Sequence, residues 1–224
     1  MLARVPKGFV VTLLSKEILL SCSAKDLGVI ADSHLSFDEQ VVSKCIGSLC
    51  QINRVKHLFD RFTLVTIINS LALSKLFYCS SMWASTTKKN IARLQKVQNF
   101  AARIVTDARK YDHITQILKE LHWLPVAKQL EVRDTLMAFK CVKGLAPPSF
   151  CDKFTTRSQV HTRNTRNNDK LNTPFFRSAT GQRSFSYRAV QLLNDLPESL
   201  TNMESFNVFK NAIKGRALDK FLSH

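Results

Sequence analysis

The stretch 86-TTKKNIARLQKVQNFAARIV-105 carries the clearest helical pattern in the chain. Its apolar residues recur three or four positions apart, which is the spacing of one buried helix face. Thr86 and Thr87 precede the pattern, and threonine is a favourable residue at a helix N-terminus. We therefore predict an amphipathic helix that begins after these threonines and ends near Val105.

The positive residues of this predicted helix lie on a different side from its apolar residues. On a wheel of about 100° per residue, the cations span about 140° of arc, and the apolar residues fall between about 160° and about 300°. The cations are Lys88, Lys89, Arg93, Lys96 and Arg103. No Asp or Glu precedes Asp107 in this helix, so it lacks the opposite-charge pairs that support a solvated face. The pattern indicates a face that binds anions, with an ordinary basic surface as the alternative.

Further helices are predicted on both sides of this stretch. Apolar spacing places them at 42–55, 64–78, 114–121, 125–143, 184–194 and from about 204 to about Phe221. Ser36 and Glu39 have the spacing of a capping box before the first of these helices, and Thr201 and Glu204 have it before the last. Gly144 is the expected stop of the helix at 125–143. Pro125 suits the first position of its helix, because a proline has no N–H to leave unsatisfied there.

The N-terminus has a different pattern. Apolar residues at 10–14 and 18–20 flank a polar break at 15–17 and predict a hairpin, and residues 24–30 predict a further short strand at the edge of a larger sheet. Residues 155–180 are polar, follow no clean period and predict a loop or a pair of poor strands. The expected fold class is mainly α, with a small N-terminal β element and a helical, partly irregular C-terminal region.

Composition and net charge limit the classes of function that this chain can have. The chain has 224 residues, of which 45% are hydrophobic and 22% are charged, values that exclude wholesale disorder. Lys and Arg total 33 against 17 Asp and Glu, a formal charge of +16. Such a surplus favours polyanionic partners, either nucleic acid or an acidic membrane surface.

A second basic zone occupies residues 150–190. Its cations are Lys153, Arg157, Arg163, Arg166, Lys170, Arg177, Arg183 and Arg188, against Asp152 and Asp169 alone. Aromatic residues are interleaved with them: Phe154, Phe175, Phe176, Phe185 and Tyr187. Arginines for phosphates and aromatic rings for bases are typical of nucleic-acid binding. The alternative is that the rings anchor the core while the arginines are merely solvated. Arg109 and Lys110, just after the central helix, complete the candidate nucleic-acid-binding residues.

Membrane and export signals are weak. The apolar stretch at 9–14 is too short for a signal peptide, and polar residues dilute the longer one at 62–83, which we interpret as a buried core helix. No two of the six cysteines form a C-x-x-C motif, and we interpret them as free thiols. We expect an intracellular protein with no membrane partner.

Catalytic motifs are missing from the sequence. It contains no G-x-S-x-G, phosphate-binding loop, H-E-x-x-H or G-x-G-x-x-G. His113 and His122 have no evident acid or nucleophile as partner, and packing for Trp123 and helix capping for Asp112 are the favoured roles. We expect no catalytic residue, no cofactor, no metal and no small-molecule substrate.

Several blocks resemble the LINE-type, jockey-like non-LTR retrotransposon reverse transcriptases. The blocks are residues 24–30 (AKDLGVI) with Asp32 and 35–37 (LSF), 94–99 (LQKVQN) with 101–103 (AAR), 110–114 (KYDHI), 118–125 (LKELHWLP), 143–148 (KGLAPP), 205–206 (SF) and 209–210 (FK). They occur in the family's order and cover nearly the whole chain.

The resemblance implies a C-terminal part of such an enzyme. It implies the last strands of the palm at 1–35, a thumb-like helical bundle at 36–106, a helical connector at 107–148, and a basic C-terminal region with two terminal helices at 149–224. In this family the thumb grips the backbone of a template–primer duplex. The implied partners are therefore RNA, an RNA–DNA hybrid or DNA.

The sequence departs from the family in one respect that bears on mechanism. The family's magnesium-binding aspartates lie in a palm hairpin, and no D-D pair occurs in this chain. The resemblance therefore implies a fragment of an RNA-directed DNA polymerase that is inactive alone, with magnesium held only in full-length relatives. The alternative is an inert remnant or a protein-interaction module without a nucleic-acid role.

Overall fold

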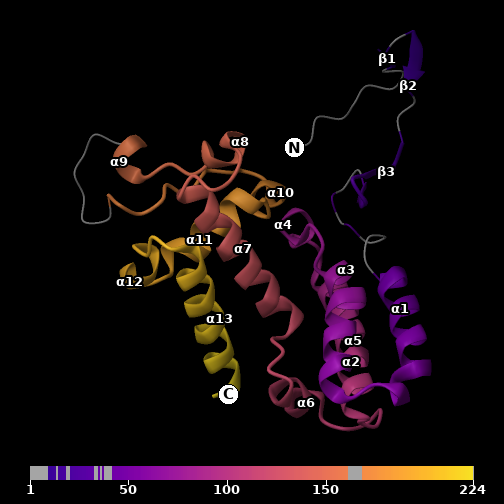
Figure 1. The fold of residues 1–224 in the computed structure, drawn as a ribbon. Helices are drawn as coiled ribbons and strands as arrows, with labels where there is room; N and C mark the ends of the chain where they lie inside the picture. Colours follow the sequence, from indigo (N-terminus) through magenta and orange to yellow (C-terminus); the bar gives the residue numbers. More distant parts are fainter. Residues whose placement is uncertain are drawn as a thin grey trace.

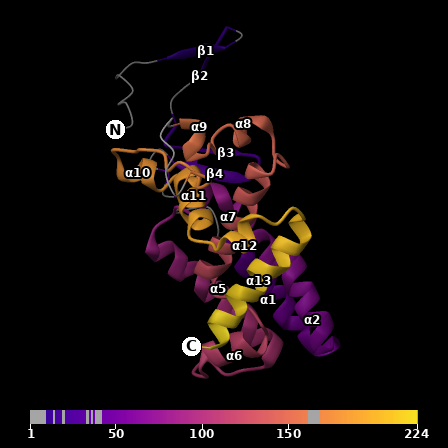
Figure 2. The same cartoon turned by 90° about the vertical axis from the view of Figure 1, so that its left-hand side faces the viewer.

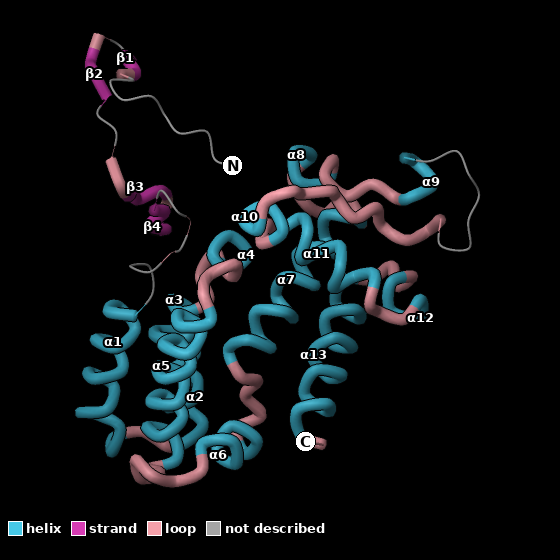
Figure 3. The backbone as a smooth tube through the Cα atoms, turned by 180° about the vertical axis from the view of Figure 1, so that it is seen from behind, coloured by secondary structure: helices cyan, strands magenta, loops and turns pink. Residues whose placement is uncertain are grey.

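Two small hairpins precede the helices in the computed structural model, which describes residues 10–13, 15–18, 21–32, 35, 37, 42–160 and 168–223. Strand β1 (Val11–Leu13) pairs antiparallel with β2 (Lys16–Ile18), and β3 (Ser23–Asp26) pairs antiparallel with β4 (Val29–Asp32). In the described part of the chain they form two separate two-stranded sheets rather than the edge of a larger one. Figure 3 shows both hairpins at one end of the molecule.

The prediction of one strand at 24–30 was wrong, because a tight turn divides this stretch. Leu27 and Gly28 connect β3 to β4 with φ angles of 44° and 87°. Two positive φ angles define the turn that matches the twist of a hairpin, and glycine adopts the second without strain. The first hairpin was predicted correctly, but Lys16 and Glu17 lie inside β2 rather than in the turn.

The first group of helices contains the predicted amphipathic helix. Its elements are α1 (Val42–Val55), a 3₁₀ turn η1 (Lys56–Leu58), α2 (Arg61–Ile68), a π-helical segment η2 (Asn69–Leu73), α3 (Ser74–Leu76), α4 (Ser80–Trp83) and α5 (Lys88–Thr106). Helix α5 confirms the sequence prediction closely. The helix predicted at 64–78 begins earlier, because the side chain of Asp60 accepts hydrogen bonds from the N–H groups of Phe62 and Thr63. The capping box expected at Ser36 and Glu39 lies outside the described residues.

The first core lies between α1, α2, α3 and α5. Leu49, Ile68, Leu76 and Leu94 are fully buried in it, together with Trp83, whose indole N–H donates to the Tyr78 carbonyl over 2.7 Å. The stretch at 62–83, interpreted as one buried core helix, is divided among α2, η2, α3 and α4 and is buried on one side only. Within the described residues, no helix is both long and apolar enough to cross a membrane.

The second group of helices forms around α7 (Figure 1). Helix α6 (Ile114–Glu120) precedes this group and packs against α5. The group itself contains α7 (Val126–Val142), α8 (Pro148–Cys151), α9 (Arg157–Val160), α10 (Ala179–Gln182), α11 (Phe185–Asn194), α12 (Glu198–Thr201) and α13 (Phe206–Leu222). In the second core, the rings of Phe139 and Phe209 stack with their centroids 3.9 Å apart. The mainly α fold class is confirmed. The stretch at 155–180, predicted as a loop or a pair of poor strands, contains the short helix α9 and the start of α10. An isolated antiparallel bridge joins Thr156 to Leu171 within it.

Three expected caps are built differently in the structure. Pro125 was expected as the first residue of its helix, but it precedes α7 with an extended ψ of 148°. The helix begins at Val126, whose N–H donates to the Gln95 side chain. Asp112 accepts from the Arg109 N–H and does not cap α6. The capping box at Thr201 and Glu204 was wrong, because Thr201 ends α12 and Ser205 precedes α13.

Helix α7 joins the two cores. Its N-terminal residues Val126 and Leu130 belong to the first core, and Val132, Ala138 and Phe139 belong to the second. The end of α13 returns to α6, where Lys119 donates to the Leu222 carbonyl (Figure 2). The first core therefore continues beyond residue 106 into α7.

We predict that the second core depends on the Phe139–Phe209 stack. Phe209→Ala should lower the free energy of unfolding by about 3–5 kcal/mol, because it leaves a cavity beside Phe139. Phe175→Ala is the control, since 84% of Phe175 is exposed, and it should change stability by less than about 0.5 kcal/mol. Urea denaturation measures both, and equal losses would contradict this assignment of the core.

Candidate nucleic-acid interface

Helix α5 is held by its apolar side. Leu94, Val97, Ala101, Ile104 and Val105 are buried, and the helix packs against α1, α2, α6 and α7. Its N-terminus is capped as predicted, because the Thr87 side chain accepts from the Asn90 N–H. The buried side fixes the rotation of the helix, and its opposite side faces solvent.

The cations of α5 occupy that opposite side. Lys88, Lys89, Arg93 and Lys96 are exposed, and Arg103 is half-buried with its Nε donating to the Arg109 carbonyl over 3.2 Å. Lys88, Lys89 and Lys96 form no ion pair within the described part of the chain. The arrangement that the wheel predicted is therefore present in the structure.

The position of these charges does not favour the helix itself. Lys88 and Lys89 lie in the first turn of α5, which contains no acidic residue. The N-terminus of a helix carries a partial positive charge, so cations there are mildly destabilising. The first turn of α5 therefore keeps two cations at a position that is mildly unfavourable for the helix itself.

A hollow at the other end of α5 adds further cations. It has a volume of about 330 Å³ and its lining includes Lys56, Arg103 and Lys110. Lys56 forms an ion pair with Asp107, the residue that ends α5 in a left-handed conformation. Two of the three cations therefore remain without a carboxylate partner among the described residues.

Tyr111 is an exposed aromatic residue that the sequence did not lead us to include among the candidate nucleic-acid-binding residues. Its side chain is 89% exposed, and the Lys110 ammonium lies 5.7 Å from the ring centroid. An exposed ring beside a cation is a surface on which a base can stack. The adjacency of a lysine and a tyrosine was the signal available in the sequence.

The second basic zone is less uniform than the first. Arg177 and Arg183 are exposed at the two ends of α10, and Arg157 is half-buried at the start of α9. Figure 1 shows α9 far from α5, so the structure does not bring this zone onto the α5 face. Arg163 and Arg166 lie outside the described residues.

Most aromatic rings of this zone are half-buried, and each contacts another ring. Phe154 contacts Phe185 edge to face, and Phe176 contacts Tyr187 in the same way, with centroids 6.0 and 6.2 Å apart. Phe175 is the exception, because it is exposed. Phe154 and Phe185 pack against the second core, so the alternative of core anchors describes these two rings better than base stacking does. Phe176 and Tyr187 are half-buried.

Arg188 is committed to an internal ion pair. Its Nη2 donates to Asp134 Oδ2 over 2.8 Å and to the Ser81 carbonyl over 3.3 Å. The Asp134 side chain is only 4% exposed, and burial raises the pKa of its carboxyl, an effect that the charge of Arg188 partly offsets. The pair links α11, α7 and α4, so we do not include Arg188 in the interface.

Neither the search for a metal site nor the comparison with known proteins adds a residue to this interface. Among the described residues, no three His, Cys, Asp or Glu side chains lie close enough together to hold a metal ion. No model of a known protein family, no curated protein and no solved structure matches the chain.

The Arg188–Asp134 pair gives a stability prediction. Arg188→Met should lower the free energy of unfolding by about 3–5 kcal/mol, because Asp134 would remain buried without its counter-charge. The double variant Asp134→Leu/Arg188→Met should recover much of that loss, since an apolar pair needs no counter-charge. Urea denaturation of both variants measures the difference. A double variant no more stable than the single one would contradict the assignment.

Proposed function

We propose that this chain binds the sugar–phosphate backbone of RNA, of an RNA–DNA hybrid or of DNA through the cationic face of α5. We further propose that it is a fragment of a LINE-type, non-LTR retrotransposon reverse transcriptase that lacks the polymerase aspartates. The observation that carries the proposal is the exposed row Lys88, Lys89, Arg93 and Lys96 on a helix without a single Asp or Glu.

The spacing of these cations suits a nucleic-acid backbone. Lys89, Arg93 and Lys96 follow one another by four and three residues. At 1.5 Å per residue they span about 10 Å along the helix axis. A duplex advances about 3.4 Å per nucleotide along each strand, so the row covers roughly three nucleotides. A rigid helix can thus present its cations to consecutive phosphates.

Contacts of this kind determine what the protein recognises. Phosphate contacts fix position and orientation but carry no sequence information. An RNA–DNA hybrid or a double-stranded RNA is then distinguished by its groove shape rather than by base edges. Arg109, Lys110 and the exposed ring of Tyr111 extend the surface beyond the end of α5. We propose that the chain alone does not extend a primer.

The proposal predicts a specific loss on charge reversal. The triple variant Lys89→Glu/Arg93→Glu/Lys96→Glu should bind an RNA–DNA hybrid at least about tenfold more weakly at moderate salt, because three phosphate contacts become repulsive. Fluorescence anisotropy with a labelled hybrid measures the affinity. Circular dichroism establishes that the variant is folded, which we expect because the changed side chains are exposed.

The matched control removes the same charge elsewhere. Lys128→Glu/Arg216→Glu/Lys220→Glu changes exposed cations of α7 and α13 and lowers the net charge equally. Its affinity should fall much less than that of the α5 variant. Equal losses would mean that only net charge matters, and absent binding by the folded wild type would favour the inert remnant.

A further inference from the structure

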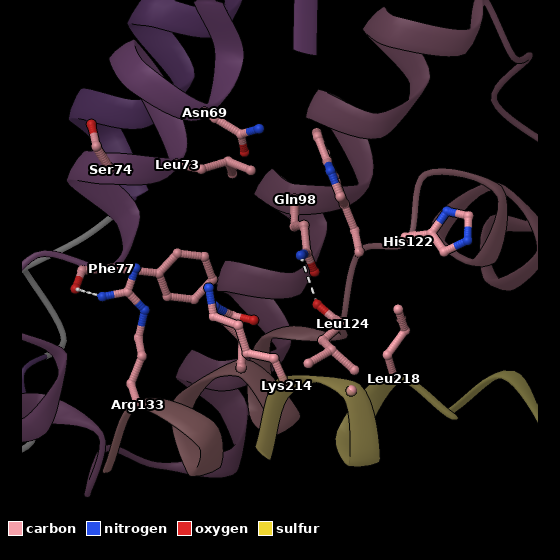
Figure 4. Close-up of a pocket in the computed structure, with 13 residues that line it drawn as sticks. Asn69, Leu73, Ser74, Phe77, Gln98, His122, Leu124, Arg133, Lys214 and Leu218 are labelled. Atoms are coloured by element: carbon pink, nitrogen blue, oxygen red, sulfur yellow. Dashed lines mark hydrogen bonds between the residues drawn. The ribbon is translucent and has the colours of Figure 1, made fainter. Parts of the chain in front are cut away.

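A pocket of about 500 Å³ lies where the two groups of helices meet (Figure 4). Its lining comes from η2 and α3, from α5, from the turn after α6, and from α7 and α13. Gln98, which lines it, belongs to the buried side of α5 and donates to the Leu124 carbonyl over 2.9 Å. The pocket is therefore on the opposite side of α5 from the cationic face.

The lining has the composition of a small-molecule site. The apolar part includes Leu73, Phe77, Trp123, Leu124 and Leu218. A few polar groups interrupt it: Asn69, Ser74, Gln98, His122 and Gln129. Pockets of a few hundred cubic ångströms with mainly apolar walls and a few polar groups are typical binding sites for small ligands.

Arg133 brings an incompletely satisfied guanidinium to this pocket. Its Cζ lies 4.9 Å from the centroid of the Phe77 ring, and its Nη1 reaches the Phe77 carbonyl only at 3.5 Å. Its Nε is buried and has no hydrogen-bond partner among the described residues. No carboxylate of the described residues pairs with it. A half-buried cation without a carboxylate partner is costly, and an anion in the pocket would offset that cost.

Lys214 adds a second cation to the same pocket. It projects from α13, is exposed and lines the pocket, and it forms no ion pair within the described ranges. Partial burial lowers the pKa of Lys214, and repulsion from Lys210 and Arg133 lowers it further. No Asp or Glu of the described residues lines the pocket beside these two cations, so a dianion would relieve their repulsion.

The wall opposite α13 is irregular. In η2 the Ser74 N–H donates to the Asn69 carbonyl, five residues earlier, instead of to the usual fourth. Such π-helical turns are rare and are often found at functional sites. Asn69, Leu73 and Ser74, which bound or follow this segment, all line the pocket. The irregular turn is thus located at the pocket rather than elsewhere in the fold.

We propose that this pocket binds a small organic phosphate with a planar body, such as a nucleoside 5′-monophosphate. Arg133 and Lys214 hold the phosphate, whose charge of nearly −2 at neutral pH matches theirs. Phe77, Trp123 and Leu218 enclose the planar body, and the amide side chains form hydrogen bonds with its edge. This site does not depend on the proposed binding of nucleic acid by α5.

Titration with adenosine 5′-monophosphate tests the proposal. Isothermal calorimetry should show saturable binding to the wild type, and the fluorescence of Trp123 should change with it. Lys214→Met, at an exposed position, should weaken binding at least about tenfold, since a charged hydrogen bond is lost. Arg133→Gln should weaken it similarly. Lys220→Met removes an exposed cation of the same helix that does not line the pocket, and it should bind like the wild type.

Three further titrations separate the sources of affinity. Adenosine, which lacks the phosphate, and inorganic phosphate, which lacks the planar body, should both bind more weakly than the monophosphate. The α5 charge-reversal variant should keep wild-type affinity for the monophosphate, which distinguishes this site from the nucleic-acid interface. Absent binding by the folded wild type, or undiminished binding by Lys214→Met, would overturn the proposal.

Discussion

The fold depends on one helix that belongs to two cores. Helix α7 contributes Val126 and Leu130 to the first core and Phe139 to the second. A helix is rigid over this length, so it fixes how the two groups of helices are placed relative to each other. The Asp134–Arg188 pair strengthens the same junction, because it joins α7 to α11 and the Arg188 side chain also reaches α4.

This arrangement gives the two faces of α5 different roles. The apolar face packs against its neighbours, and Gln95 and Gln98 hold the start of α7 through Val126 and Leu124. The other face is left for solvent and carries only positive charge. The same packing that orients α5 thus fixes its cations in a row on the surface. It also makes α5 part of the wall of the pocket between the helix groups.

Sequence analysis correctly predicted the helix limits that capping residues and apolar spacing determine locally. The limits of α5 follow from Thr87 and from the apolar spacing, and they hold almost to the residue. The β3–β4 hairpin was missed because Leu27 is an unusual residue for a left-handed turn position. Arg188 resembled a surface cation because its partner, Asp134, lies in a distant segment. Arg133 and Lys214 likewise meet only after α7 and α13 have packed, so no sequence pattern relates them.

The wild-type salt dependence of hybrid binding tests the central claim most directly. If the α5 face neutralises about four to six phosphates, log K should fall with log salt at a slope of roughly −3 to −5. The measurement uses an RNA–DNA hybrid, with single-stranded RNA and duplex DNA as comparisons. A slope in this range is the result we predict. A slope near zero, or no binding at low salt by folded protein, would contradict a backbone-binding role for α5.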